Sequence, residues 1–163
     1  AANIHPPKPL ALDALLAFAS PGSCAPGPLL DPLRKSVLRD TTFRGHPVVG
    51  PLEMPARFKA AVGPIALHRI TGGYRATLPM RGTWFGMPVT SLETRAYDGG
   101  DGGGFRIAFA ANRDRVRAAL NQAGFDIPEK GEREIVDPRG GESRAISLIR
   151  RGSTTELRCD VHD

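Results

Sequence analysis

Tyr74-Arg75-Ala76-Thr77-Leu78-Pro79-Met80-Arg81 is the stretch that decides the fold class. Its even-numbered residues are apolar or aromatic, and arginine or threonine fills most of its odd-numbered positions. Successive side chains of a β-strand point to opposite faces, so this period of two predicts a strand with one face in the core and one in solvent. Antiparallel sheets tolerate such one-sided burial, so an antiparallel sheet is the expected centre of the fold.

Further strands are expected on both sides of this stretch. The short connections between them are rich in glycine, which favours antiparallel pairing of neighbouring strands. The expected strands are residues 48–52, 65–70, 84–97, 105–109, 145–150 and 154–161, with turns at 82–83, 98–104 and 152–153, a polar loop before residue 145, and an interruption or bulge at Gly86 and Pro88.

Three helices are expected beside this sheet. Leucines and alanine at i, i+3, i+4 and i+7 predict a helix over residues 10–19, and a similar apolar stripe predicts a second over 28–39. Asn112 is a good N-cap and Gly124 a good C′ residue for a third. The sequence thus predicts an α+β fold, a mainly antiparallel sheet with two short N-terminal helices and one later helix packed on one face.

Length and composition favour a single domain. A chain of 163 residues can bury about 70% of its unfolded surface in one core. The 19 glycines and 15 prolines indicate many turns and short elements. Prolines crowd residues 1–9, so we expect a flexible Pro-rich N-terminal lead over 1–9 and a single α+β domain over 10–163. No apolar run reaches the roughly 18 residues of a membrane span, so a membrane-spanning chain is not expected.

The two cysteines indicate an oxidising compartment. Cys24 and Cys159 form an even count with wide separation, and Cys159 shares the inward face of its expected strand with Leu157. We therefore expect a disulfide between them and a periplasmic or secreted protein. The start at Ala1, with prolines close behind, resembles the mature side of a cleaved signal peptide. The alternative is a pair of buried thiols in a cytosolic protein.

Positive charge is concentrated in the first half of the chain. Residues 1–81 carry a net charge of +6 and residues 82–163 a net charge of −1. Between Glu53 and Glu93 the chain has no acidic residue. A basic surface of this kind attracts an acidic partner, although a chance gap between sparse acids would look the same.

No motif in the sequence specifies a reaction, a metal or a cofactor. The Gly-x-Ser-x-Gly elbow of serine hydrolases is absent, and the phosphate-binding glycine loops do not occur between a strand and a helix. Cys159 and His162 form only a partial metal-ligand set at a chain end. The loop at 98–104 has two carboxylates but lacks the other ligands that calcium requires. We therefore expect no catalytic residue, no metal and no cofactor.

Surface recognition is the hypothesis that these observations leave. The acid-free window contains arginines together with the only tryptophan, and Trp and Arg are the residue types that most often anchor interfaces. The candidate binding residues are Arg69, Tyr74, Arg75, Arg81, Trp84 and Phe85. The competing interpretation is that Trp84 and Phe85 fill the core.

These residues favour an exported, noncatalytic binding protein of the inhibitor, immunity or envelope-adaptor type. Its basic and aromatic sheet face would bind an acidic protein or another anionic envelope component. The alternative is a small extracytoplasmic hydrolase acting on cell-envelope material, with His46 or His68 and a distant carboxylate in its site. Nucleic-acid binding is a third possibility, which export would disfavour.

Overall fold

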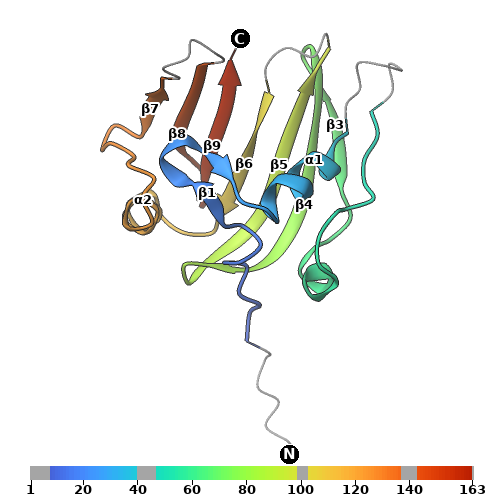
Figure 1. Ribbon diagram of the computed structural model, residues 1–163, viewed down its shortest axis with the longest axis horizontal. Helices are drawn as coiled ribbons and strands as arrows, with labels where there is room; N and C mark the ends of the chain where they lie inside the picture. The colour runs from blue at the N-terminus through green and yellow to red at the C-terminus, as the bar shows by residue number, and fades with distance from the viewer. Residues whose placement is uncertain (1–7, 40–46, 99–102, 137–142, 163) are drawn as a thin grey trace, which may run out of the picture.

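A single antiparallel sheet forms the centre of the computed structural model, which describes residues 8–39, 47–98, 103–136 and 143–162 (Figure 1). Among these residues seven strands pair in the order β3-β4-β5-β6-β9-β8-β7. Each contact joins antiparallel neighbours, as the alternation at residues 74–81 predicts. The strands are β3 (Ala66–Ile70), β4 (Gly73–Trp84), β5 (Met87–Tyr97), β6 (Gly103–Phe109), β7 (Glu132–Ile135), β8 (Ser143–Arg151) and β9 (Thr154–His162).

The remaining elements contribute their apolar side chains to one face of this sheet, here called the covered face. They are β1 (Phe18–Ser20), η1 (Pro21–Ser23), β2 (Ala25–Pro26), α1 (Leu30–Val37), η2 (Ala56–Ala61) and α2 (Arg113–Gln122). Leucines of α1 and α2 belong to the same buried cluster as Leu78, Ile107 and Leu157 of the sheet. Figure 1 shows α1 and β1 on the same side of the strands, with α2 beside β7 and β8. The expected α+β class with a mainly antiparallel sheet is confirmed.

The helix expected over residues 10–19 is wrong. The chain there makes one turn, closed by the hydrogen bond from Leu16 N to Leu12 O (2.9 Å), and then enters β1. Before this turn the backbone pairs with β4, where Thr83 N donates to Leu10 O (2.9 Å) and Leu12 N donates to Thr83 O (2.7 Å). Leu12, Leu15 and Leu16 are fully buried, so their spacing reflects burial and not a continuous helix.

The other two expected helices are present, so the arrangement is one short N-terminal helix, α1, and one later helix, α2. Asn112 caps α2, since its side-chain oxygen accepts a hydrogen bond from Arg115 N (2.8 Å). Gly124 follows the helix with a φ of 100°, as a C′ glycine does. No described helix is long and apolar enough to cross a membrane.

Three expectations for the strands are wrong. β4 continues through residues 82–83, and the hairpin turn is formed by Phe85 and Gly86. Residues 48–52 contain only an isolated bridge between Val48 and Arg39. The polar stretch before residue 145 is not all loop. It contains the edge strand β7, which pairs with β8 and is held from the other side because Arg133 donates hydrogen bonds to the backbone oxygens of Gly22, Phe125 and Asp126.

The disulfide between Cys24 and Cys159 is present, as predicted. It joins the loop after η1 to the inward face of β9, across 135 residues of sequence and a Cα–Cα distance of 5.9 Å. Both cysteines are buried in the core cluster. A structural disulfide of this kind persists in oxidising compartments outside the cytoplasm. Most of the expected lead over residues 1–9 and most of the 98–104 loop lie outside the described residues.

Candidate binding surfaces

The face of the sheet opposite the covered face, here called the open face, carries a cluster of charged side chains from β4, β5, β6, β8 and β9. Glu93 of β5 is its first centre. Its carboxylate lies 3.1 Å from Arg95 Nε, 3.5 Å from Arg106 Nε and 3.6 Å from Arg75 Nε. These contacts arise because Glu93 is directly opposite Arg106 in the ladder between β5 and β6. One carboxylate therefore serves three guanidinium groups.

Glu156 of β9 is the second centre. Its carboxylate lies 2.9 Å from Arg158 Nε, 3.5 Å from Arg151 Nη1 and 3.8 Å from Arg106 Nη1. Arg106 thus joins the two centres. We call this set the arginine array, and it consists of Arg75, Arg95, Arg106, Arg151 and Arg158 with Glu93 and Glu156. Five guanidinium groups face two carboxylates, so the array holds a surplus of positive charge.

Arg106 is the least compensated member of the array. Its side chain is only 12% exposed. Burial lowers the pKa of Arg106, and the positive charges of Arg158 and Arg95 lower it further, while the charges of Glu93 and Asp160 oppose this with a smaller effect. Its Nε is buried and makes no hydrogen bond with any described residue, and the same holds for Nε of Arg75. Buried donors without a hydrogen-bond acceptor are costly, so Arg106 and Arg75 each carry a desolvation penalty.

The pKa of Arg95 is shifted in the opposite direction to that of Arg106. Burial alone would lower the pKa of Arg95, but hydrogen bonds and charge interactions with Tyr97 and Glu93 raise it. Its guanidinium is therefore well paired. The positive surplus of the array is therefore most evident at Arg106.

The structure divides the predicted binding residues between the two faces of the sheet. Arg75 and Arg81 alternate with buried residues of β4 and lie on the open face, Arg75 within the array and Arg81 exposed. Arg69 and Tyr74 are direct partners in the ladder between β3 and β4 at the edge of the covered face. The Arg69 guanidinium stacks on the Tyr74 ring at 4.7 Å and pairs with Asp98 at 3.1 Å. These two pairs do not form one surface.

Trp84 does not belong to any surface. It is 2% exposed and stacks against Phe18 and Phe109 in the core, with ring centroids 5.8 and 5.7 Å apart. Trp84 ends β4 with its side chain on the covered face, since it lies two and four residues after the buried Gly82 and Met80. Its predicted role as an interface anchor is therefore replaced by the core interpretation.

Phe85 is the member of the set that remains an exposed aromatic residue. It occupies the first position of the two-residue turn between β4 and β5, with φ values of 51° at Phe85 and 72° at Gly86. Two positive φ values are typical of a type I′ turn, which strongly prefers Asn-Gly or Asp-Gly. The ring is 42% exposed, stacks on Trp84 at 4.9 Å, and its backbone N donates to Asp13 Oδ2 (3.1 Å). A bulky residue in the left-handed region is unusual and costs backbone energy.

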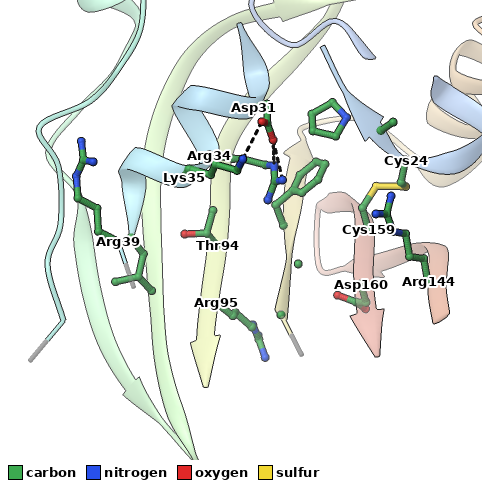
Figure 2. Close-up of a pocket in the computed structure, with 16 residues that line it drawn as sticks. Cys24, Asp31, Arg34, Lys35, Arg39, Thr94, Arg95, Arg144, Cys159 and Asp160 are labelled. Atoms are coloured by element: carbon green, nitrogen blue, oxygen red, sulfur yellow. Dashed lines mark hydrogen bonds and ion pairs between the residues drawn. A yellow bond between two sulfur atoms is a disulfide. The ribbon is translucent and has the colours of Figure 1, made fainter. Parts of the chain in front are cut away.

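The covered face has a cleft of about 830 Å³ between α1 and the disulfide (Figure 2). Thr94 and Phe105 lie on the sheet side of it, and Leu38 and Pro26 add apolar surface. Five basic residues line it, Arg34, Lys35, Arg39, Arg95 and Arg144, together with two acidic ones, Asp31 and Asp160. A second hollow of about 760 Å³ lies beside β7 and β8 and is lined by Glu132, Glu134 and Asp160 among others.

The hydrolase alternative named His46 or His68, and of these two only His68 lies in the described part of the chain. No histidine lines either hollow. His68 is exposed on the edge strand β3, while His46 lies outside the described residues. Within residues 8–39, 47–98, 103–136 and 143–162 no three His, Cys, Asp or Glu side chains are grouped as metal ligands would be.

Most of the array was missed by sequence reasoning. Its signal was nevertheless present, because Glu93 and Arg95, Arg106, and Glu156 and Arg158 each alternate with buried residues of their strands. The Glu93 centre and the Glu156 centre of the array become neighbours only because β6 pairs with β9, and these strands are separated by more than 40 residues.

Comparison of the chain with protein-family models, curated proteins and solved structures gave no match. A functional proposal for this chain therefore depends on the geometry of its described residues.

Proposed function

We propose that the chain is an exported, noncatalytic binding protein of the inhibitor, immunity or envelope-adaptor type, and that its open face binds an acidic partner. The observation that carries this proposal is the arginine array, in which five guanidinium groups share two carboxylates. Periplasmic or secreted placement belongs to the same proposal and is supported by the disulfide.

The array is suited to an acidic protein surface for an electrostatic reason. Arg106 is held in a partly desolvated place next to two other arginines. A carboxylate from a partner would offset that repulsion and accept hydrogen bonds from the guanidinium groups. Because the array lies on the face of a sheet and not in a deep pocket, its natural ligand is a broad surface with several acidic groups.

The array is also organised before any partner binds. Glu93 and Glu156 hold the arginines in fixed positions, and strand pairing fixes the two glutamates. Ordering long side chains costs binding energy, and here the fold has already met most of that cost. Arg81 extends the positive surface toward the end of β4 without an ion pair of its own among the described residues.

Binding of poly-L-glutamate tests the proposal. We expect Arg106→Met and Arg81→Gln each to weaken binding severalfold and to reduce its dependence on NaCl, because each removes one cation from the contact. Lys59→Gln is the matched control, since exposed Lys59 lies on η2, whose Phe58 packs in the core. Titration calorimetry at two salt concentrations measures both quantities.

If Lys59→Gln weakens binding as much as the open-face variants, binding follows net charge alone and the proposal fails. If only the open-face variants weaken binding, crosslinking in envelope and culture fractions of the source cells identifies the physiological partner. That partner must be lost in the Arg106→Met variant and retained in Lys59→Gln.

A further inference from the structure

We infer that the cleft between α1 and the disulfide is a second binding site, for a small organic anion in which a phosphate or carboxylate is attached to an apolar body. It lies on the covered face and shares Arg95 with the array proposed for the acidic partner (Figure 2). Its volume of about 830 Å³ falls within the range of pockets that hold small ligands.

The charge of the lining selects an anion. Of the two carboxylates, Asp31 is already paired with Arg34 at 2.7 Å and with Lys35 at 3.0 Å. Asp160, from β9, has no ion pair within the described residues and opposes an anion placed close to it. Arg39 is paired with Glu53 at 3.5 Å and Arg95 with Glu93 at 3.1 Å, outside the cleft lining. The basic excess of the cleft therefore comes from Arg34, Lys35 and Arg144, and a concave surface lined mainly by one sign of charge concentrates the opposite ion.

The guanidinium of Arg34 is already held in one orientation that leaves donors for such a ligand. Both its Nε and its Nη2 face Asp31 Oδ1, at 2.9 and 2.7 Å, which fixes the plane of the guanidinium. The same guanidinium lies over the Phe105 ring at 5.5 Å. A guanidinium has five N–H donors, so the Nη1 end stays available to a phosphate or carboxylate oxygen.

Arg144 supplies a second guanidinium from the opposite wall. It extends from β8 toward the disulfide, as Figure 2 shows, while Arg34 descends from α1 on the other side. Two guanidinium groups on facing walls suit an anion with several oxygens, which can accept from both at once.

The rest of the lining fits an apolar body. Phe105, Leu38, Pro26 and the disulfide present apolar surface beside the charged groups. Gly104, with a φ of 149°, pairs so closely with β9 that a Cβ would collide with the Cys159 carbonyl oxygen. The strand is therefore restricted to glycine there, and no side chain from this position fills the cleft.

Thr94 adds a polar feature to the sheet side of the cleft. Its side chain is 7% exposed, and its hydroxyl makes no hydrogen bond with any described residue. Unsatisfied buried hydroxyls are rare in folded proteins. A ligand oxygen, or a water molecule bound with the ligand, would satisfy it.

Titration with hexyl phosphate, followed by the amide NMR signals of Thr94, Gly103 and Gly104, tests this site. We expect saturable shifts at these amides, with weaker binding of inorganic phosphate, which lacks the apolar body. Hexanoate distinguishes a phosphate site from one that accepts any anionic head group. Saturation with hexyl phosphate but not with hexanoate would assign the site to phosphates.

Arg34→Gln and Arg144→Gln should each weaken hexyl phosphate binding about tenfold, the typical effect of one charge-assisted hydrogen bond. Arg150→Gln is the matched control, because Arg150 lies on the same strand as Arg144 and outside the cleft. Arg34→Gln also loses the pairing with Asp31, so Arg144→Gln keeps the test valid if the first variant is unstable.

The site is refuted if hexyl phosphate fails to saturate, or if Arg144→Gln binds it as tightly as Arg150→Gln does. The array variant Arg106→Met should keep hexyl phosphate binding. Failure of the cleft and failure of the proposed function are therefore separate outcomes.

Discussion

Arg106 and Glu93 touch each other in the array, yet their removal should have different consequences for stability. Arg106→Met deletes a partly desolvated cation that lies beside Arg95 and Arg158. Glu93 keeps Arg95 at 3.1 Å and Arg75 at 3.6 Å, and Glu156 keeps Arg158 at 2.9 Å. No carboxylate of the array is left without a partner, and methionine preserves most of the buried side-chain volume.

The expected change in unfolding free energy for Arg106→Met is therefore within about 1 kcal/mol of zero, because the lost attractions are offset by lost desolvation and repulsion. Glu93→Gln, by contrast, leaves Arg75, Arg95 and Arg106 without their shared carboxylate. Breaking a buried pair costs about 3–5 kcal/mol, and the partial exposure of these side chains favours the lower value of about 3 kcal/mol. For a chain of this length that is a fall in Tm of about 6–12 °C.

Urea unfolding followed by circular dichroism, with scanning calorimetry for Tm, measures both variants under the same buffer conditions. Addition of NaCl should narrow the difference between Glu93→Gln and wild type, because salt screens the exposed part of the arginine repulsion. If Arg106→Met costs as much as Glu93→Gln, the array is balanced in charge. The surplus on which the proposed function rests would then not exist.

Three further predictions concern other parts of the molecule. Replacing Cys24 and Cys159 together by alanine should lower the unfolding free energy by up to about 5 kcal/mol, since the disulfide closes a loop of 135 residues, and urea unfolding of the variant measures this loss. Phe85→Asn should leave Tm nearly unchanged in calorimetry, because the favoured Asn-Gly turn offsets the lost stacking on Trp84, whereas Phe85→Val should lower Tm since a β-branched residue resists a positive φ. Burial would raise the pKa of Asp31, but hydrogen bonds from Lys35 and Arg34 and the charges of these two residues outweigh burial and lower the pKa. The stabilising contribution of the Asp31 carboxylate is therefore present above its unfolded-state pKa of about 3.9 and is lost as pH falls through its folded-state pKa. Exposure limits this contribution to less than about 1 kcal/mol, and the stability difference between wild type and Asp31→Asn should vanish in urea titrations below that pH.

Local patterns were sufficient to predict the antiparallel character of the sheet and the position of α2. The alternation along β4 and β6 and the capping residues Asn112 and Gly124 are set by neighbours in sequence, and the structure has these elements, although β4 extends to Trp84 through the expected turn. The helix over residues 10–19 failed for a tertiary reason. Leu12, Leu15 and Leu16 are buried, but the backbones of Leu10 and Leu12 form hydrogen bonds with Thr83, a residue about 70 positions away. No local pattern reveals such a partner.

The candidate sites were less predictable than the fold, because they depend on which strands become neighbours. Arg75 was recognised on the polar face of its strand, but its partner Glu93 and the bridging Arg106 come from β5 and β6. Phe85 could not be placed at a turn, since a phenylalanine at positive φ contradicts local preference. Such local conflict is expected where a residue serves binding more than stability.

Arg95 connects the two proposed sites. It pairs with Glu93 in the array and also lines the cleft beside Gly104, since the sheet carries no side chain at that glycine to separate them. An anion in the cleft and an acidic partner on the open face would therefore compete for, or share, one guanidinium. In the described part of the chain Arg106 belongs only to the array and Arg144 lines only the cleft, so substitution of these two residues perturbs one site at a time. If hexyl phosphate alters poly-L-glutamate binding through Arg95, the same effect in Arg144→Gln should need about tenfold more hexyl phosphate.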